Sequence, residues 1–383
     1  MLEYVDRKNT NCVKWDLLKD VFGQEDLLAL WVADMDFKAP QEVRDALKAY
    51  AERGTYGYDP VPEAFYDAFL RWEKDVHGLS LTKEDLFYTP GVVTGFNWAV
   101  LAYTDPDDAI LIQPPVYPPF FKAVETNGRT LVTNELLYKD GVYTCDFEDF
   151  EAKIRDKNVT MFILCSPHNP CGRVWTKEEL SKMLEICNKY HVLIVADEIH
   201  QDIISPGHRQ IPLLSLPHSD NVIAFTAPSK TFNLAGLKMS IGIIKNPELK
   251  KMWEALRDTT KIVSGTPFGY IAAERAYSCG KDWLNEVQAQ IWENYCLLRE
   301  TLLKALPNVS VTPLEGTYLA WVNFENYLSP DEMEHFFTET CRIAPNYGSW
   351  FRGRSSGTFI RINLATRKEN IEKACERIIE NLK

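Results

Sequence analysis

A lysine that follows a buried strand is the first residue whose position suggests chemistry. Residues 222–226 are β-branched, small or aromatic, a pattern typical of a buried strand, and Lys230 comes shortly after them in Ala227-Pro-Ser-Lys230. Burial of an ammonium lowers its pKa, because the charged form loses its hydration. Such an amine is a nucleophile that can form a Schiff base with a carbonyl compound. The alternative is an ordinary lysine that reaches solvent from the end of the strand.

Other polar residues occupy similar positions along the chain. Asn169 follows one predicted strand, whereas Asp197 and His200 follow the next. In an open parallel sheet the carboxyl ends of the strands lie at one edge, where ligands bind. We therefore expect these three side chains to lie near Lys230.

A phosphate-binding position is predicted at Gly91-Val-Val-Thr94, which begins a helix. The first turn of a helix has free amide N–H groups, and its dipole favours an anion. Lys238, which lies near a glycine-containing bend after Lys230, could supply a second positive charge for the same anion.

Each of these features has a plainer alternative. Asn169 lies in a turn signature, Asp197 could cap a helix, and Gly91 could simply begin a packed helix. The acidic and histidine residues at 197–202 could bind a metal, although their spacing matches no recognised ligand pattern. Arg361, inside a short apolar run, could be an edge-strand arginine. Chance explains any one of these features more easily than all of them in this order.

Alternating strands and helices predict an α/β fold with a mostly parallel, doubly wound sheet, followed by a smaller α+β domain. The predicted domains are an N-terminal arm at 1–38, a large domain at 39–280 and a small C-terminal domain at 281–383. The predicted strands are residues 109–112, 160–165, 192–196, 222–226, 240–244, 317–324 and 358–363. The predicted helices are residues 14–22, 40–53, 63–77, 92–103, 177–190, 247–277, 282–306, 330–341 and 368–381.

Composition excludes several classes of protein. The chain has 383 residues, 45% of them hydrophobic, and a net charge of −12 without a basic run, which argues against a nucleic-acid surface. The N-terminus has no apolar signal region, and no stretch is apolar enough for a membrane span. The nine cysteines are scattered and form no C-x-x-C pair. We therefore expect a cytoplasmic protein with reduced thiols and no bound metal.

The order of these motifs resembles that of the fold type I pyridoxal-phosphate (PLP) enzymes, the aminotransferase class I/II superfamily. Within it, the chain is similar to the MalY/PatB-type carbon–sulfur lyases, the cystathionine β-lyases. The motifs that carry this resemblance cover nearly the whole chain: residues 10–16 (TNCVKWD), 31–37 (WVADMDF), 167–175 (PHNPCGRVW), 197–200 (DEIH), 228–233 (PSKTFN) and 316–319 (GTYL).

The resemblance implies roles around the cofactor ring. Lys230 would hold pyridoxal phosphate as a Schiff base and later act as the base at the substrate Cα. Asp197 would keep the pyridine nitrogen protonated, and Asn169 would donate to the 3′-oxygen. Tyr117 would stack on the ring. His200 replaces the tyrosine of related aminotransferases, which leaves a second contact to the 3′-oxygen open.

The resemblance also implies how the phosphate is bound. Its ligands would be the backbone N–H groups of Val92 and Val93, the Ser229 hydroxyl and the Lys238 ammonium. Tyr58 matches a tyrosine that reaches the phosphate of the neighbouring subunit, which implies a homodimer.

The implied reaction is αβ-elimination from a cysteine S-conjugate such as L-cystathionine, giving a thiol, pyruvate and ammonia, as in methionine biosynthesis. Arg361 would bind the substrate α-carboxylate in a bidentate pair. The alternatives are an aminotransferase that uses the same lysine, aspartate and arginine, and a non-catalytic protein on the same fold. His200 and residues 31–37 favour the lyase.

Overall fold

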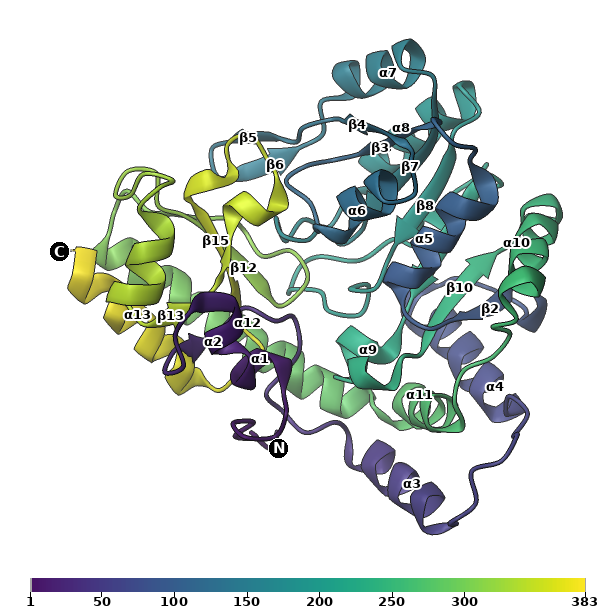
Figure 1. The fold of residues 1–383 in the computed structure, drawn as a ribbon, viewed down its shortest axis with the longest axis horizontal. Coiled ribbons are helices and arrows are strands. Elements are labelled where there is room, and N and C mark those ends of the chain that lie inside the picture. Colours follow the sequence, from purple (N-terminus) through teal and green to yellow (C-terminus); the bar gives the residue numbers. More distant parts are fainter. Residues whose placement is uncertain (1, 383) are drawn as a thin grey trace.

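The computed structural model describes residues 2–382, and it confirms the predicted α/β fold. Within these residues, a seven-stranded sheet has the order β2-β10-β9-β8-β7-β3-β4 (Figure 1). Strands β4, β3, β7, β8 and β9 run parallel, whereas β10 is antiparallel to both of its neighbours. The bounds are β2 (Leu86–Thr89), β3 (Ala109–Ile112), β4 (Thr130–Thr133), β7 (Val159–Cys165), β8 (Leu193–Asp197), β9 (Val222–Thr226) and β10 (Ser240–Ile244).

Helices cover both faces of this sheet because its buried strands are apolar on both faces. Along β3, Ile110 and Ile112 pack into one hydrophobic cluster, whereas Ala109 and Leu111 pack into the other, since successive side chains of a strand point to opposite faces. The helices here are α3 (Gln41–Glu52), α4 (Glu63–Trp72), α5 (Val92–Tyr103), α6 (Pro119–Glu125), α7 (Phe147–Asp156), α8 (Lys177–Lys189), α9 (Pro228–Thr231), α10 (Pro247–Thr260) and α11 (Pro267–Cys279).

Helix α5 lies very close to the sheet because it has a glycine where it crosses β9. A Cβ atom on Gly95 would lie 2.5 Å from the Phe225 ring, so only glycine allows this approach. The close approach brings the first turn of α5 next to the ends of β8 and β9.

A second sheet lies in the C-terminal part of the chain. Within residues 2–382 it has four strands in the order β11-β12-β15-β14. In Figure 1 the purple helices α1 and α2 lie beside this part, and β1 pairs in parallel with β13. The N-terminal segment therefore pairs with the C-terminal part, and the boundaries of the predicted domains stay a prediction. The bounds are α1 (Val13–Asp16), α2 (Leu18–Phe22), β1 (Leu28–Ala29), α12 (Lys281–Ala305), β11 (Ser310–Val311), β12 (Leu319–Asn323), β13 (Ile343–Ala344), β14 (Asn346–Tyr347), β15 (Phe359–Asn363) and α13 (Lys368–Leu382).

Three predicted elements were wrong in extent. The long helical region expected at 247–277 is interrupted at residues 261–266, where Lys261 adopts a left-handed conformation (φ 57°) that ends α10. The helix expected at 330–341 is a short π-helical segment, His335–Thr340, since Ser329 and Glu332 form a local turn before it. The helix expected at 63–77 also changes to a π-helical turn, Glu73–His77, after α4. The small hairpin of β5 (Leu137–Lys139) and β6 (Val142–Thr144) was not predicted.

Candidate active site

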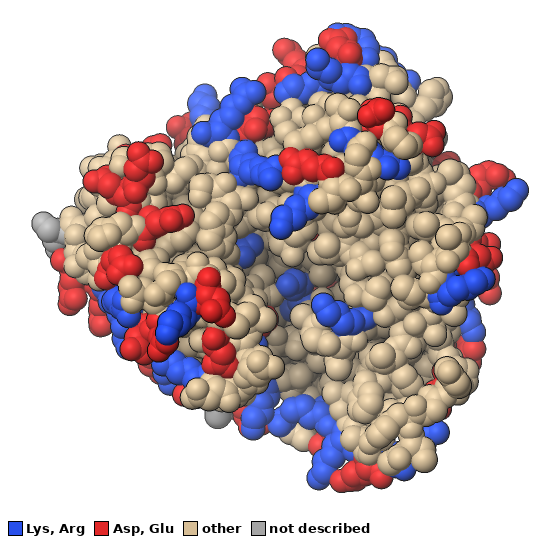
Figure 2. Space-filling model, viewed as in Figure 1, with Lys and Arg blue, Asp and Glu red and all other residues tan. Residues whose placement is uncertain are grey.

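A cavity of about 230 Å³ lies at the carboxyl ends of the parallel strands. In Figure 2, which has the same view as Figure 1, the molecule is hollowed near its centre, and blue Lys and Arg atoms lie in the hollow. The structure brings nine of the predicted residues together in the cavity wall: Val92, Val93, Tyr117, Asn169, Asp197, His200, Ser229, Lys230 and Lys238.

Lys230 lies on α9, a single turn that follows β9. Its Nζ donates a hydrogen bond to the Ala33 carbonyl oxygen at 2.7 Å. Burial lowers the pKa of Lys230 to about 8, although the nearby Asp34 carboxylate opposes the shift. About a tenth of this side chain is therefore an uncharged amine at pH 7, far more than for an ordinary lysine, and the uncharged form is the one that a Schiff base or a general base requires.

Asp197 is the last residue of β8, and its side chain is buried. It accepts a hydrogen bond from the Ile199 backbone N–H at 3.2 Å. Burial raises the pKa of Asp197 to about 7, and neither that bond nor the more distant charge of Lys230 offsets the cost. A protonated pyridine nitrogen against this carboxylate would compensate its charge, so the residue fits pyridoxal phosphate.

His200 is held in a neutral state beside the same cavity. Burial, together with the charges of Lys230 and Arg361, lowers its pKa well below the usual value. Its ring packs edge-on against Tyr318 at 5.7 Å, and its Nδ1 has no hydrogen-bond partner among residues 2–382. A neutral imidazole with a free nitrogen could contact a polar group of the cofactor or the substrate.

Arg361 lies on β15, at the border between the cavity and the second sheet. Its guanidinium donates to Asn169 Oδ1 at 2.8 Å, to the Trp31 carbonyl at 3.1 Å and to Asn346 Oδ1. Burial lowers its pKa to about 10. Within the described part of the chain no carboxylate pairs with this guanidinium, and its Nε has no partner. A buried cation without a counter-ion fits an anionic substrate group.

The start of α5 forms one end of the cavity. Gly91, the residue before the helix, has φ 134°, a conformation that strongly favours glycine, and its N–H donates to Ser240 Oγ at 3.0 Å. The amides of Val92 and Val93 lie in the first turn, where N–H groups have no partner within the helix. With Lys238 beside them, these amides form a site suited to a phosphate.

Residues 31–37 run beside the cavity and line it at Ala33, a placement that the sequence did not predict. Side chains from distant parts of the chain hold their carbonyl groups, and Lys230 and Tyr318 share the Ala33 carbonyl, with the Tyr318 hydroxyl at 2.8 Å. Other donors are Arg361 to Trp31, Asn363 to Val32 and Asp34, Asn233 to Met35 and Phe37, and the nearby Arg7 to Met35. The WVADMDF motif was a signal for this segment, but it did not reveal which groups it contacts.

Tyr117 and Tyr58 are placed differently. Tyr117 lines the cavity, next to the loop in which Val116 N–H donates to the Phe351 carbonyl. Tyr58 is fully exposed on the loop before α4 and does not line the cavity of its own chain. Its predicted contact with a neighbouring subunit therefore stays a prediction.

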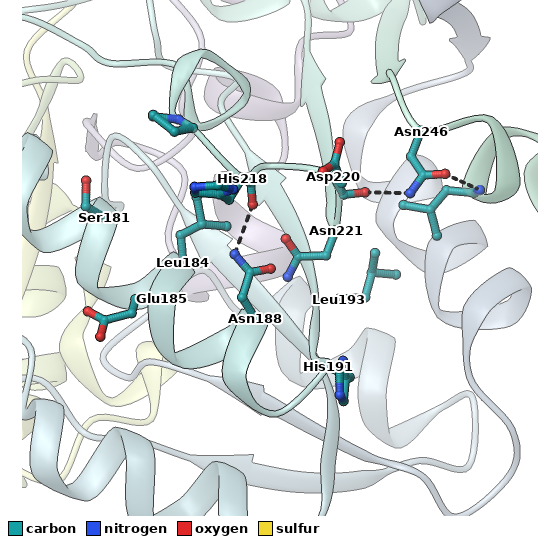
Figure 3. A pocket seen from close by; sticks show the side chains of 12 residues that line it. Ser181, Leu184, Glu185, Asn188, His191, Leu193, His218, Asp220, Asn221 and Asn246 are labelled. Atoms are coloured by element: carbon teal, nitrogen blue, oxygen red, sulfur yellow. Dashed lines mark hydrogen bonds between the residues drawn. The ribbon is translucent and has the colours of Figure 1, made fainter.

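A second, more open cavity lies at the amino ends of the parallel strands of the same sheet. This groove, of about 830 Å³, lies between the end of α8, the starts of β8 and β9, and the start of α10 (Figure 3). Asn188 Nδ2 donates to the His218 carbonyl at 2.9 Å, and Asn246 Nδ2 donates to the Asp220 carbonyl at 3.0 Å. None of the residues predicted for the site lines this groove.

Residues 2–382 show neither a membrane-spanning helix nor a cluster of metal ligands. No helix there is both long and apolar enough to cross a bilayer. In the same residues, no group of three or more His, Cys, Asp and Glu side chains is arranged to hold a metal ion, and this includes the cluster at 197–202.

Comparisons with known proteins give full-length similarities. A family model described as aminotransferase class I and II matches residues 25–378. Cystathionine beta-lyase PatB of Bacillus subtilis is 38% identical over 376 residues, which is 97% of this chain and 97% of that protein. The structure of a PLP-bound putative aminotransferase from Clostridium difficile has a TM-score of 0.96 and 37% identity, and covers 100% of this chain and 99% of that one. Cystalysin from Treponema denticola, which contains pyridoxal 5′-phosphate, has a TM-score of 0.95 and 37% identity, with coverage of 99% and 98%.

Proposed function

Because the chain belongs to the aminotransferase class I and II family, we propose that it is a PLP-dependent carbon–sulfur β-lyase. It cleaves cysteine S-conjugates such as L-cystathionine to a thiol, pyruvate and ammonia. The observation that carries this proposal is the shared cavity in which Lys230 and Asp197 lie, with Arg361 beside it. Full-length similarity to a cystathionine β-lyase favours elimination over transamination.

The cavity residues divide between the ring and the phosphate of the cofactor. Lys230 would hold the cofactor covalently, Asp197 would face its ring nitrogen, and Asn169, His200 and Tyr117 would surround the ring. The phosphate would take the amides of Val92 and Val93, the Ser229 hydroxyl and the Lys238 ammonium. When bound, pyridoxal phosphate supplies an electron sink for the charge that develops at the substrate Cα.

Arg361 binds and orients the substrate. Its guanidinium presents parallel N–H groups that match a carboxylate, and its present partners are neutral oxygen atoms that a carboxylate can outcompete. Desolvation strengthens this ion pair, because the arginine is buried. The carboxylate would thereby fix the Cα–H bond relative to Lys230.

Lys230 moves the proton. In its neutral form Nζ accepts the Cα proton, and the Ala33 carbonyl at 2.7 Å can hold the resulting ammonium. A thiol is a good leaving group near neutral pH because its pKa is about 8.5. A thiolate therefore departs without needing the strong acid that a hydroxyl group would require.

We also propose that the enzyme is a cytoplasmic homodimer. The exposed Tyr58 supports a dimer in which this residue reaches the phosphate site of the neighbouring subunit. A reducing compartment fits the nine cysteines, which are all free thiols.

The test is incubation of the purified enzyme with L-cystathionine without a keto acid, following pyruvate and the visible absorbance of the cofactor. We expect continuous pyruvate release that Lys230→Ala abolishes, with Lys182→Ala, an exposed lysine on α8, as the unaffected control. A single turnover that resumes only after a keto acid is added would instead establish an aminotransferase.

A further inference from the structure

A buried carboxylate lies directly behind the turn that carries the lysine. Asp202 accepts three side-chain hydrogen bonds: Oδ1 takes Trp72 Nε1 at 2.8 Å and His77 Nε2 at 2.7 Å, and Oδ2 takes Thr231 Oγ1 at 2.6 Å. Its backbone carbonyl also accepts from Gln288 of α12 at 2.7 Å. Asp202 therefore joins α4, the π-helical turn, α9 and α12 at one point.

The cluster around Asp202 is costly to bury. Glu73 and Glu198 lie close to His77, and all four ionisable side chains are buried. The hydrogen bond from His77 holds the pKa of Asp202 below its usual value despite burial, so the carboxylate stays ionised and acts only as an acceptor. Buried ionic groups give little net stability compared with a well-packed apolar core. A π-helical turn, which is frequent at functional sites, supplies two of the four groups.

Each of the three residues after Lys230 is fixed by a separate contact. The Thr231 hydroxyl donates to Asp202, and the Phe232 ring packs edge-on against Trp72 at 5.6 Å. Asn233 is bonded to the backbone of Met35 and Phe37. Since α9 is a single turn with little stability of its own, these contacts determine where Lys230 points.

We propose that Asp202, through its hydrogen bond to Thr231, is a positioning residue for Lys230. The inference rests on the proposed function only in that Lys230 is the reacting amine. Asp202 does not line the cavity, so its effect is transmitted through the Thr231 hydroxyl. Loss of that bond would let the turn shift, and small misplacements of a catalytic group reduce the rate strongly.

The chain offers a matched set of variants. Thr231→Val removes the hydroxyl that donates to Asp202 and keeps the β-branched shape, whereas Thr231→Ser keeps the hydroxyl. Thr226→Val is the control, because Thr226 is equally buried, on the adjoining strand, and its Oγ1 has no hydrogen-bond partner among residues 2–382. Asp202→Ala removes the carboxylate oxygen that accepts the Thr231 bond.

The measurements use the holoenzyme. The first is the pH titration of its visible absorbance without substrate, which reports on the Lys230–cofactor linkage whatever reaction follows. The second is steady-state kinetics with L-cystathionine. For Thr231→Val we expect a shifted titration midpoint and a kcat lower by about 10-fold or more, with KM changed less than about twofold. Thr231→Ser restores both values, Asp202→Ala shifts the midpoint in the same way as Thr231→Val, and Thr226→Val matches the wild type.

The proposal is overturned if Thr231→Val and Thr226→Val give the same midpoint and the same kcat. It is also overturned if Thr231→Ser loses as much kcat as Thr231→Val, since the hydroxyl would then be irrelevant. If Thr231→Val does not fold, the midpoint of Asp202→Ala decides, because this variant lacks the oxygen that accepts the Thr231 bond: an unchanged value contradicts the proposal. Failure of the wild type to release pyruvate would count against the lyase assignment and leave the absorbance comparison intact.

Discussion

Two cavities of opposite character lie at opposite ends of the parallel strands of the large sheet. The cavity at the carboxyl ends of the strands measures about 230 Å³ and gathers buried groups with shifted pKa values, among them Lys230 and Asp197. The groove at the amino ends measures about 830 Å³, and its asparagines already bond to neighbouring carbonyl groups. The larger cavity is therefore not the proposed active site, which is distinguished by buried charged groups with shifted pKa values.

We expect the largest effect from removal of the Asp197 carboxylate, one of the buried charged groups that distinguish the smaller cavity from the groove. Asp197→Ala should lower kcat with L-cystathionine by about 100-fold or more, because it removes a charge fixed against the cofactor ring. Activity and cofactor absorbance, measured on the same preparation, separate a slower reaction from lost cofactor. A kcat within about tenfold of the wild type would mean that this carboxylate is not the ring partner.

Arg361 tests whether the unpaired guanidinium is a substrate site. Arg361→Lys loses a bidentate pair, worth about 1.5–3 kcal/mol, so kcat/KM should fall about 10- to 100-fold. The control is Arg352→Lys, because Arg352 is 47% exposed and pairs with Glu125. Equal effects at the two positions would contradict a specific role for Arg361.

Burial of Glu73, in the cluster around Asp202, should make the folding stability of the protein depend on pH. Burial raises the pKa of Glu73 from 4.5 to about 7. The folded protein therefore binds more protons than the unfolded chain between these values, and stability falls as the pH rises through this window. Glu73→Gln does not titrate, so the decrease in Tm from about pH 5 to pH 8 should shrink by the equivalent of about 2 kcal/mol. Glu185→Gln, on the exposed rim of the groove, should leave the decrease unchanged.

Substitutions in the groove should have little effect on stability or activity. Asn188→Ala removes the exposed bond to the His218 carbonyl and should cost no more than about 1 kcal/mol of stability, with kcat within about twofold of the wild type. Steady-state kinetics and thermal melting check both values. A tenfold loss of activity would mean that the groove contributes to the reaction, and the two cavities would then not differ in function.

The sequence predicted five of the seven strands of the large sheet, all but β2 and β4, and the meeting of Lys230, Asp197 and Asn169, because alternating elements place the carboxyl ends of parallel strands on one side of the sheet. It did not predict that the carbonyls of residues 31–37 contact Lys230 and Arg361. Those bonds join residues far apart in the chain and involve the backbone, which leaves no pattern of side chains to read. Nor did it predict the break at residues 261–266 between α10 and α11, although Gly265 and Pro267 are residues that commonly end and begin helices.

The contacts of residues 31–37 also bear on how the protein is made. The Trp31 carbonyl accepts a hydrogen bond from Arg361, which lies 330 positions later in the chain, and the Ala33 carbonyl accepts one from Tyr318, 285 positions later. A nascent chain emerging from the ribosome can therefore complete the large sheet and the turn of Lys230 before β15 is synthesised. The hydrogen bonds from Tyr318 and Arg361 to residues 31–37 form only later. The lysine acquires its final surroundings only near the end of translation, so a truncated chain would carry the reactive amine without the enclosure that controls it.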